Sequence, residues 1–315
     1  MEASGEERAV GGDLYELPEG CVANVLSFTG PADVGRLSMV SFTFKSASES
    51  DAVWESFLPN DYHSIISSSS SSFLLSSSSS KKDLYLRLCD SPILIDDGKK
   101  SFSLDKLSGK KCYMLSARDL MIVWGDTPRY WRWTSELKSR FEEVAELIGV
   151  CWLEICGKIS ARMLSPETLY AAYFVYKTTA GAYGFDHQPV EVTVGLAGTE
   201  GCKRSVYLDA ERERQQRYQI VIRRIGLFSH SRALGLQAPV PTRENNDGMH
   251  PQEREDGWLE IELGTFFNKE DDDGDLEMKV LEVNGGDWKG GLIVQGIDIR
   301  PKPGGNIQNK LAIEA

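Results

Sequence analysis

Residues 257–263 have the sequence GWLEIEL, which carries the clearest structural signal in this chain. Apolar Leu259, Ile261 and Leu263 alternate with acidic Glu260 and Glu262. Side chains in a β-strand point alternately to its two faces, so a period of two predicts a strand with one face toward a core. We therefore expect a half-buried strand here.

Similar short runs, rich in β-branched and aromatic residues, recur on both sides of this stretch. They are CWLEI at 151–155, AAYFVYK at 171–177, PVEVTVGL at 189–196, LEMKVLEV at 276–283 and GLIVQGIDI at 291–299. Turn-forming residues separate many of them, and this arrangement predicts an antiparallel β-sandwich. Residues 135–148 are the exception, because their apolar residues fit helical spacing, although less cleanly.

The N-terminal residues have a different pattern, which predicts short helices. Val22, Val25 and Leu26 recur at helical spacing, and Pro31 opens a second helical stretch. A third contains Ala47, Ala52, Val53, Trp54 and Phe57. About forty residues form only a small core, so we expect an apolar face that belongs to a partner.

Serine runs at 67–72 and 76–80 separate the two patterns. Such a tract buries almost nothing, which predicts a flexible linker. The expected fold is α + β and multidomain: a helical unit at 12–60, a serine-rich linker at 61–82 and an antiparallel sandwich at 83–305.

Composition excludes several classes of protein. The 315 residues carry a net charge of −12, so nucleic acid and anionic membrane surfaces are poor partners. No apolar run approaches the roughly 18 residues of a membrane span, and the acidic first ten residues do not form a signal peptide. The six scattered cysteines predict reduced thiols. We expect a protein of the nucleus and cytoplasm.

The first candidate site is aromatic: Trp124, Tyr130, Trp131 and Trp133 lie within ten residues around Thr127-Pro128. Indole rings stack on the apolar face of sugars, but the same rings can form a core. The second is acidic: residues 270–273 and Asp275 form either a solvated hairpin loop or a segment whose end supplies acceptors for sugar hydroxyls. In that case Asp275 and Glu282 are the candidate acceptors.

Catalytic and metal-binding patterns are not found. The histidines lie apart, no G-x-S-x-G motif is present, and no carboxylate pair stands out for glycoside hydrolysis. GDWKGG at 286–291 lacks phosphate-loop spacing and predicts a hairpin turn. Five arginines between 212 and 224 form a local basic patch, which predicts a solvated face or, as the alternative, a contact for an acidic partner. We expect no enzymatic activity, no metal and no cofactor.

The N-terminal residues resemble an F-box. The residues that carry the resemblance are Leu17, Pro18, Glu19, Val25–Phe28, Pro31, Asp33, Leu37, Val40, Ser41, Val53 and Trp54, although Thr29 stands where many F-boxes have leucine. The resemblance implies a three-helix unit that docks on the Skp-type adaptor of a cullin-based ubiquitin ligase. It makes Leu17, Pro18, Leu26, Leu37 and Val40 candidate adaptor-binding or supporting residues.

Residues 110–301 resemble the plant phloem-lectin family. The main carrying motifs are ARDL at 117–120, Trp124, YW at 130–131, WLEI at 152–155, REDGWLEIEL at 254–263, Trp288 and GIDIRP at 296–301. The resemblance implies a jelly-roll-like lectin domain that binds N-acetylglucosamine oligomers and N-glycan cores. Trp124, Trp131, Asp275 and Glu282 fall at its carbohydrate-binding positions, with Asp275 in place of a glutamate.

Together the two resemblances imply a substrate-recognition subunit of a ubiquitin ligase, with a Skp-type adaptor, a cullin scaffold and a client as its partners. Selection of a glycoprotein client by its glycan is the leading hypothesis. Sugar-independent recognition of a protein client, and a free nucleocytoplasmic lectin, are the alternatives.

Overall fold

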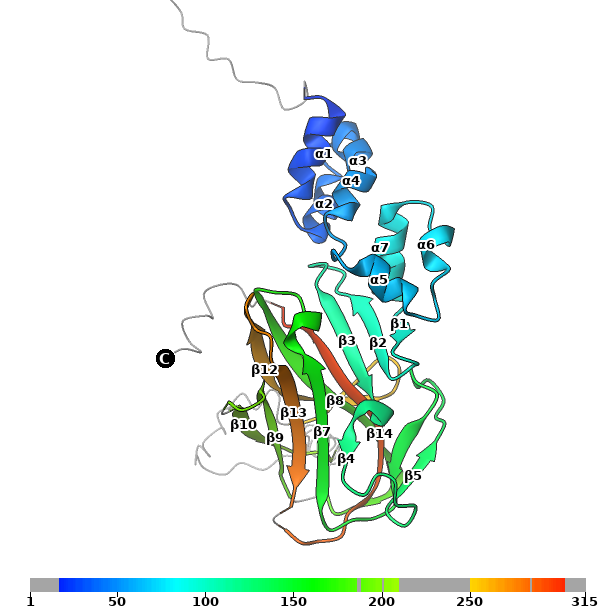
Figure 1. Cartoon of the computed structure of the whole chain (residues 1–315), viewed down its shortest axis with the longest axis vertical. Helices are drawn as coiled ribbons and strands as arrows, with labels where there is room; N and C mark the ends of the chain where they lie inside the picture. The colour runs from blue at the N-terminus through cyan, green and yellow to red at the C-terminus, as the bar shows by residue number, and fades with distance from the viewer. Residues whose placement is uncertain (1–16, 186–187, 200, 210–249, 284, 304–315) are drawn as a thin grey trace, which may run out of the picture. The chain divides into compact units, whose positions relative to one another are not determined.

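A computed structural model of the chain describes residues 17–185, 188–199, 201–209, 250–283 and 285–303 (Figure 1). It divides into two compact units. The first contains Met1–Ile93 and Ser103–Lys110, and the second contains Leu94–Phe102 and Lys111–Ala315. The basic patch at 212–224 lies outside the described residues. The predicted class, a helical region followed by a mostly antiparallel β domain, is confirmed.

Seven short helices form the described part of the first unit. They are α1 (Glu19–Ser27), α2 (Pro31–Leu37), α3 (Phe42–Ala47), α4 (Asp51–Glu55), α5 (Tyr62–Ser67), α6 (Leu74–Ser77) and α7 (Lys81–Asp90). The local sequence explains where several of these helices begin. Pro31 occupies the first position of α2, and the hydroxyls of Ser41 and Ser80 cap α3 and α7 by accepting from the Phe44 and Asp83 amides.

The core of this unit centres on Trp54, whose indole Nε1 donates to the Ser48 carbonyl at 2.6 Å. The Tyr85 ring of α7 packs against Trp54 with ring centroids 5.2 Å apart. The Tyr85 hydroxyl also lies 3.1 Å from the Asp105 carbonyl and 3.2 Å from that of Lys106. Helix α7 and residues 103–110 therefore complete the core around the F-box-like helices.

The expected boundaries at 60 and 82 do not match this division. The serine-rich segment forms α5, α6 and the start of α7, and it buries Tyr62, Ile66 and Leu74. The serines allow these turns because their hydroxyls bond to carbonyls one turn earlier, as Ser69 does to Ile66 at 2.7 Å. The sparse apolar residues between the serines are what anchor the segment.

The second unit consists of two antiparallel sheets. The larger has the order β1-β2-β3-β14-β8-β12-β11, with β6 on β14 and β5 on β6, and the smaller has the order β10-β9-β13-β7-β4. The strands are β1 (Ile93–Ile95), β2 (Lys100–Leu104), β3 (Lys111–Ser116), β4 (Met121–Ile122), β5 (Trp131–Thr134), β6 (Val144–Leu147), β7 (Leu153–Ser160), β8 (Thr168–Tyr183), β9 (Val190–Leu196), β10 (Cys202–Val206), β11 (Gln252–Glu253), β12 (Leu259–Asn268), β13 (Asp275–Glu282) and β14 (Gly290–Pro301).

The sheets pack face to face, as Figure 1 shows for β7 and β13 in front of β8 and β14. Gly157 of β7 lies directly against the side chains of Leu115 and Ile297 from the larger sheet. All six of the strands expected from residue patterns are present, including β12 at the opening stretch. Their alternating inward residues form the core between the sheets.

Three local predictions were wrong. Residues 135–148 are turns followed by β6 rather than a helix, because Phe141 and Val144 join Met114, Val175 and Trp258 in a buried cluster on the larger sheet. The acidic segment after β12 and the GDWKGG segment after β13 are not hairpins. Each connects strands of different sheets.

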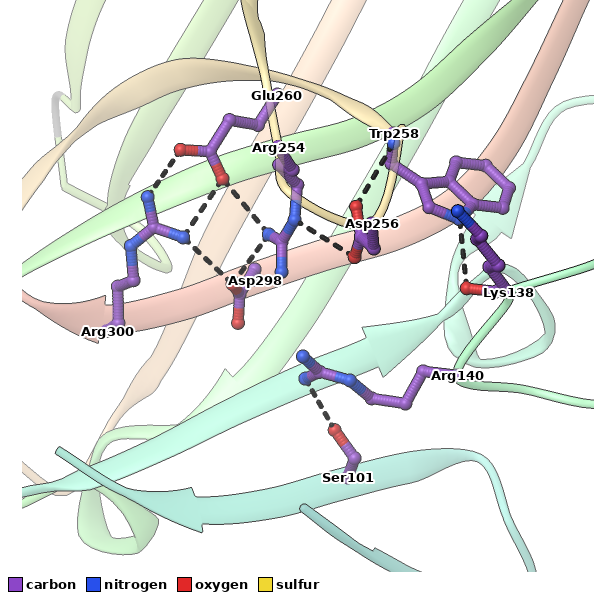
Figure 2. Close-up of polar contacts among 9 residues, drawn as sticks. All are labelled: Ser101, Lys138, Arg140, Arg254, Asp256, Trp258, Glu260, Asp298 and Arg300. Carbon is purple, nitrogen blue, oxygen red and sulfur yellow. Dashed lines mark hydrogen bonds and ion pairs between the residues drawn. The ribbon is translucent and has the colours of Figure 1, made fainter. Parts of the chain in front are cut away.

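An ionic network lies on the surface of the larger sheet (Figure 2). The carboxylate of Glu260 pairs with Arg300 at 2.5 Å and with Arg254 at 3.0 Å, and Asp298 pairs with both arginines at 3.1 Å. Burial of Asp298 opposes its ionisation, but Arg140, Arg254 and Arg300 outweigh burial and hold its pKa below the ordinary value. Asp298 is therefore an ionised and fully paired carboxylate.

Among the described residues, no helix is both long and apolar enough to cross a membrane. The six cysteines are unpaired, and Cys21 and Cys202 are exposed whereas Cys156 is buried. Burial raises the pKa of the half-buried Cys89 thiol to about 12. Cys89 is therefore protonated at neutral pH.

Candidate functional site

An exposed apolar surface on the first unit is its most distinctive feature. Phe28, Met39 and Phe42 are 84%, 80% and 85% exposed, and Val25 and Val40 are more than half exposed. Single exposed apolar residues are common, but five on one small helical unit are more than solvent exposure alone favours, and such residues suit contact with a partner. We call these five residues the apolar docking surface.

The predicted adaptor-binding residues divide between surface and core. Leu17, Pro18 and Val40 are exposed, and Leu37 is partly buried. Leu26 is fully buried in the helical core, which fits the supporting role rather than the binding role. Sequence reasoning missed Phe28, Met39 and Phe42 as surface candidates, although their apolar character beside turn residues was visible.

In the second unit, Trp124 stands on a strained turn that holds it toward solvent. Its φ angle is +60°, which costs a non-glycine residue roughly 1–2 kcal/mol. The Gly125 amide donates to the Ile122 carbonyl at 2.9 Å and closes the turn. The ring is 44% exposed and lies 5.3 Å from the Tyr130 ring. Strain that exposes an indole points to a binding role.

Trp131, the second predicted tryptophan, lies in the core. It is 2% exposed, and its Nε1 donates to the Val123 carbonyl at 3.2 Å. Trp133 bonds similarly to the Gly125 carbonyl at 3.0 Å and carries the Arg118 guanidinium over its ring. Both indoles bond to carbonyls of the 123–125 turn and so support Trp124. Trp131 is buried and Trp133 is only partly exposed.

Glu282, the predicted acceptor on β13, is buried and occupied by protein partners. It is 5% exposed, its carboxylate pairs with the ammonium of Lys289, and it accepts from the Gly285 amide at 3.1 Å. Lys289 is fully buried and also donates to the carbonyls of Asp287 at 2.8 Å and Cys151 at 3.3 Å. A direct sugar contact would require breaking this buried pair.

Asp275 begins the strand that Glu282 ends, so the two carboxylates do not converge. Seven residues along a strand correspond to about 23 Å. An odd separation also places the two side chains on opposite faces of the sheet. Asp275 is exposed, whereas Glu282 points into the sandwich. Trp124 lies toward the Glu282 end, because the Val123 amide donates to the carbonyl of Glu154, which is opposite Leu281.

The described residues contain no group of three or more histidine, cysteine or acidic side chains that could hold a metal ion. The two candidate surfaces consist of exposed aromatic and apolar side chains with hydrogen-bonding groups beside them. Such surfaces bind through packing and hydrogen bonds.

Comparison with known proteins identifies the class. Residues 14–56 match the F-box domain, and residues 110–301 match phloem protein 2. The chain is 47% identical to F-box protein At2g02240 of Arabidopsis thaliana over 285 residues, and this alignment covers 90% of this chain and 79% of the relative. It is 44% identical to F-box protein PP2-B1 of the same plant, over 91% of this chain and 89% of the relative.

The chain therefore belongs to the phloem protein 2 family and carries an F-box at its N-terminal end. Among solved structures, a Podospora anserina mannanase with a carbohydrate-binding module aligns over 61% of this chain and 28% of its own, at 9% identity and a TM-score of 0.30. So low a score carries no argument about function.

Proposed function

We propose that this chain is the substrate-recognition subunit of a cullin-based ubiquitin ligase. The F-box docks the Skp-type adaptor, which bridges it to the cullin scaffold, and the lectin-like domain selects the client. The protein itself performs no bond chemistry. It works in the nucleus and cytoplasm, where the ligase acts.

The apolar docking surface is the observation that supports adaptor binding. Phe28 and Phe42 are more than four-fifths exposed on an F-box that the family match covers. Interface anchors of this size commonly cost at least about 2 kcal/mol when truncated, which corresponds to roughly thirtyfold in affinity. The apolar surface loses its contact with water when the adaptor binds, and this supplies the driving force.

Co-purification of the full chain with a plant Skp-type adaptor tests this role. Phe28→Ala combined with Phe42→Ala is expected to lose the adaptor. Phe73→Ala is the matched control, since Phe73 is 60% exposed in the same unit but outside the surface. Retention of the adaptor by the double variant would contradict the docking role, and absence of any complex with the wild type would favour a free lectin.

For the client, we propose recognition of glycans that contain N-acetylglucosamine. The exposed Trp124 ring, held outward at the cost of backbone strain, is the observation that supports it. Indole faces stack on the C–H faces of sugars, and the adjacent Tyr130 extends the stacking surface. Trp131 and Glu282 remain proposed contributors that act from buried positions, whereas Asp275, about 23 Å from Glu282 along β13, lies apart from the surface around Trp124.

Calorimetric titration of the full chain with chitotriose tests the glycan. Saturable binding that Trp124→Ala abolishes is the expected result. Leu137→Ala is the control, because Leu137 is 87% exposed on another part of the same unit. No binding by the folded wild type, with client capture that survives removal of glycans, would instead support sugar-independent recognition of a protein.

A further inference from the structure

Three exposed residues from separate parts of the second unit gather at one end of the sandwich. Ile148 follows β6, Tyr183 ends β8 and Trp288 precedes β14, and they are 45%, 45% and 54% exposed. We call Tyr183 and Trp288, together with the neighbouring aliphatic Ile148, the aromatic platform. The predicted sugar-binding set contains none of them.

Two glycines bring the platform residues together. A Cβ at Gly149 would lie 2.9 Å from the Tyr183 hydroxyl oxygen and 3.7 Å from the Trp288 ring. A Cβ at Gly290 would lie 2.5 Å from the Ile148 carbonyl oxygen and 2.8 Å from the Tyr183 ring. Larger residues at either position would collide with these groups. Because Gly149 and Gly290 have no side chains, the Tyr183 and Trp288 side chains can pack against their backbone, and both rings remain exposed to solvent.

The buried ion pair of Glu282 and Lys289 anchors the platform from below. Lys289 follows Trp288 directly, and its backbone exchanges hydrogen bonds with Val150 at 2.8 and 3.0 Å. Its ammonium bonds to the Asp287 and Cys151 carbonyls besides pairing with Glu282. These bonds fix the backbone directly after Gly149 and on both sides of Trp288. Glu282 and Lys289 therefore set where the Trp288 ring stands.

The platform is continuous with the strained tryptophan turn. The Ile148 amide donates to the Tyr130 carbonyl at 2.9 Å, and the Tyr130 ring lies 5.3 Å from the Trp124 ring in a tilted arrangement. Trp124, Tyr130 and the platform thus line neighbouring positions along one end of the domain. A ligand longer than a single ring could contact more than one of them.

The polar groups beside the platform indicate the ligand's chemistry. Exposed Asp287 accepts from the amide of Gln188 at 2.8 Å, and the Tyr183 hydroxyl lies beside Gly149. An acidic acceptor, an amide and a phenol suit hydroxyl and acetamido groups. The protein's net charge of −12 disfavours anionic ligands. An uncharged oligosaccharide combines apolar ring faces with such donors and acceptors.

We propose that the aromatic platform is a binding surface for an uncharged oligosaccharide and that Glu282 and Lys289 are positioning residues for it. This inference rests on the proposed glycan recognition and adds to it the residues that contact the chain beyond Trp124. Glu282 acts through the Trp288 loop and does not touch the sugar.

Calorimetry with chitotriose and the full chain tests the platform. Trp288→Ala is expected to lower affinity on the order of tenfold, which is the scale of a lost aromatic contact. Leu137→Ala removes an exposed apolar side chain that is not part of the platform, so this variant should bind as the wild type does. Wild-type affinity in Trp288→Ala and in Tyr183→Ala, with binding lost in Trp124→Ala, would overturn the inference and leave the proposed glycan recognition standing.

A double-mutant cycle tests the positioning role of Glu282. Glu282→Gln should weaken chitotriose binding when it is the only substitution but should have no further effect in a chain that already carries Trp288→Ala. The reason is that Glu282 affects binding only through the position of the Trp288 ring. An equal loss in both backgrounds would overturn the positioning role. Should Glu282→Gln fail to fold, Glu282→Asp replaces it in the same cycle, since it keeps the charge but draws the carboxylate away from Lys289 and from the Gly285 amide.

Two further outcomes separate this inference from the proposed function. If the wild type binds no chito-oligosaccharide, glycan recognition fails, and the oligosaccharide assignment of the platform fails with it. If, in addition, Trp288→Ala loses capture of a client from which glycans have been removed, the platform is a protein-docking surface instead.

Discussion

Replacing Lys289 by methionine should destabilise the second unit more than any surface substitution. The Lys289 side chain is 0% exposed and that of Glu282 is 4% exposed, so the variant leaves a carboxylate buried without its cation. Breaking one side of a buried pair costs about 3–5 kcal/mol. For a unit of this size each kcal/mol lowers Tm by about 2–4 °C, which predicts a fall of about 6–20 °C.

Urea unfolding of the full chain, followed by tryptophan fluorescence, measures this loss. Lys158→Met is the matched control, because Lys158 is 54% exposed and pairs with Glu277 on the outer face of the smaller sheet. That control should unfold as the wild type does. Glu282→Leu combined with Lys289→Met should recover most of the stability, since neither charge then remains buried. A loss below about 1 kcal/mol in Lys289→Met would refute the reasoning.

Three further results are expected. Trp124→Gly should be more stable than Trp124→Ala by roughly 1 kcal/mol in thermal unfolding, because glycine accepts the positive φ, while both lose chitotriose binding. The lowered pKa of Asp298 stabilises the fold above pH about 4, and this contribution is lost as pH falls through the folded-state value, so Asp298→Asn should show a flatter acid unfolding profile. Alkylation at neutral pH, read by mass spectrometry, should label Cys21 and Cys202 and spare Cys89.

Alternation was a sound guide to the sandwich because each strand buries one face, as Glu260 and Ile261 show. The helix predicted at residues 135–148 is absent because the same apolar spacing also suits a segment that packs across a sheet. In that segment Phe141 packs in the same buried cluster as Trp258. The serine tract was expected to be a linker because its overall composition is polar, and that composition gives no sign of its few buried residues, such as Ile66. Long-range packing decided both cases.

The candidate site was only partly predictable. Trp124 and Trp131 lie in one aromatic string, and only the strained turn separates the exposed ring from the buried one. Asp275 and Glu282 could have been separated from sequence, because an odd spacing in one strand puts them on opposite faces. The role of Trp288 depends on Gly149, which lies far away in the sequence and meets it only in the folded chain.

Residues 103–110, which join two strands, belong to the helical unit and hold Tyr85 through their carbonyls. During synthesis, the core around Trp54 therefore cannot close until residue 110 has left the ribosome. A chain cut at residue 60 would retain the F-box motif but lose the ring that covers Trp54. The core beneath the F-box motif of this protein is therefore completed by sequence that follows the motif, as far as residue 110.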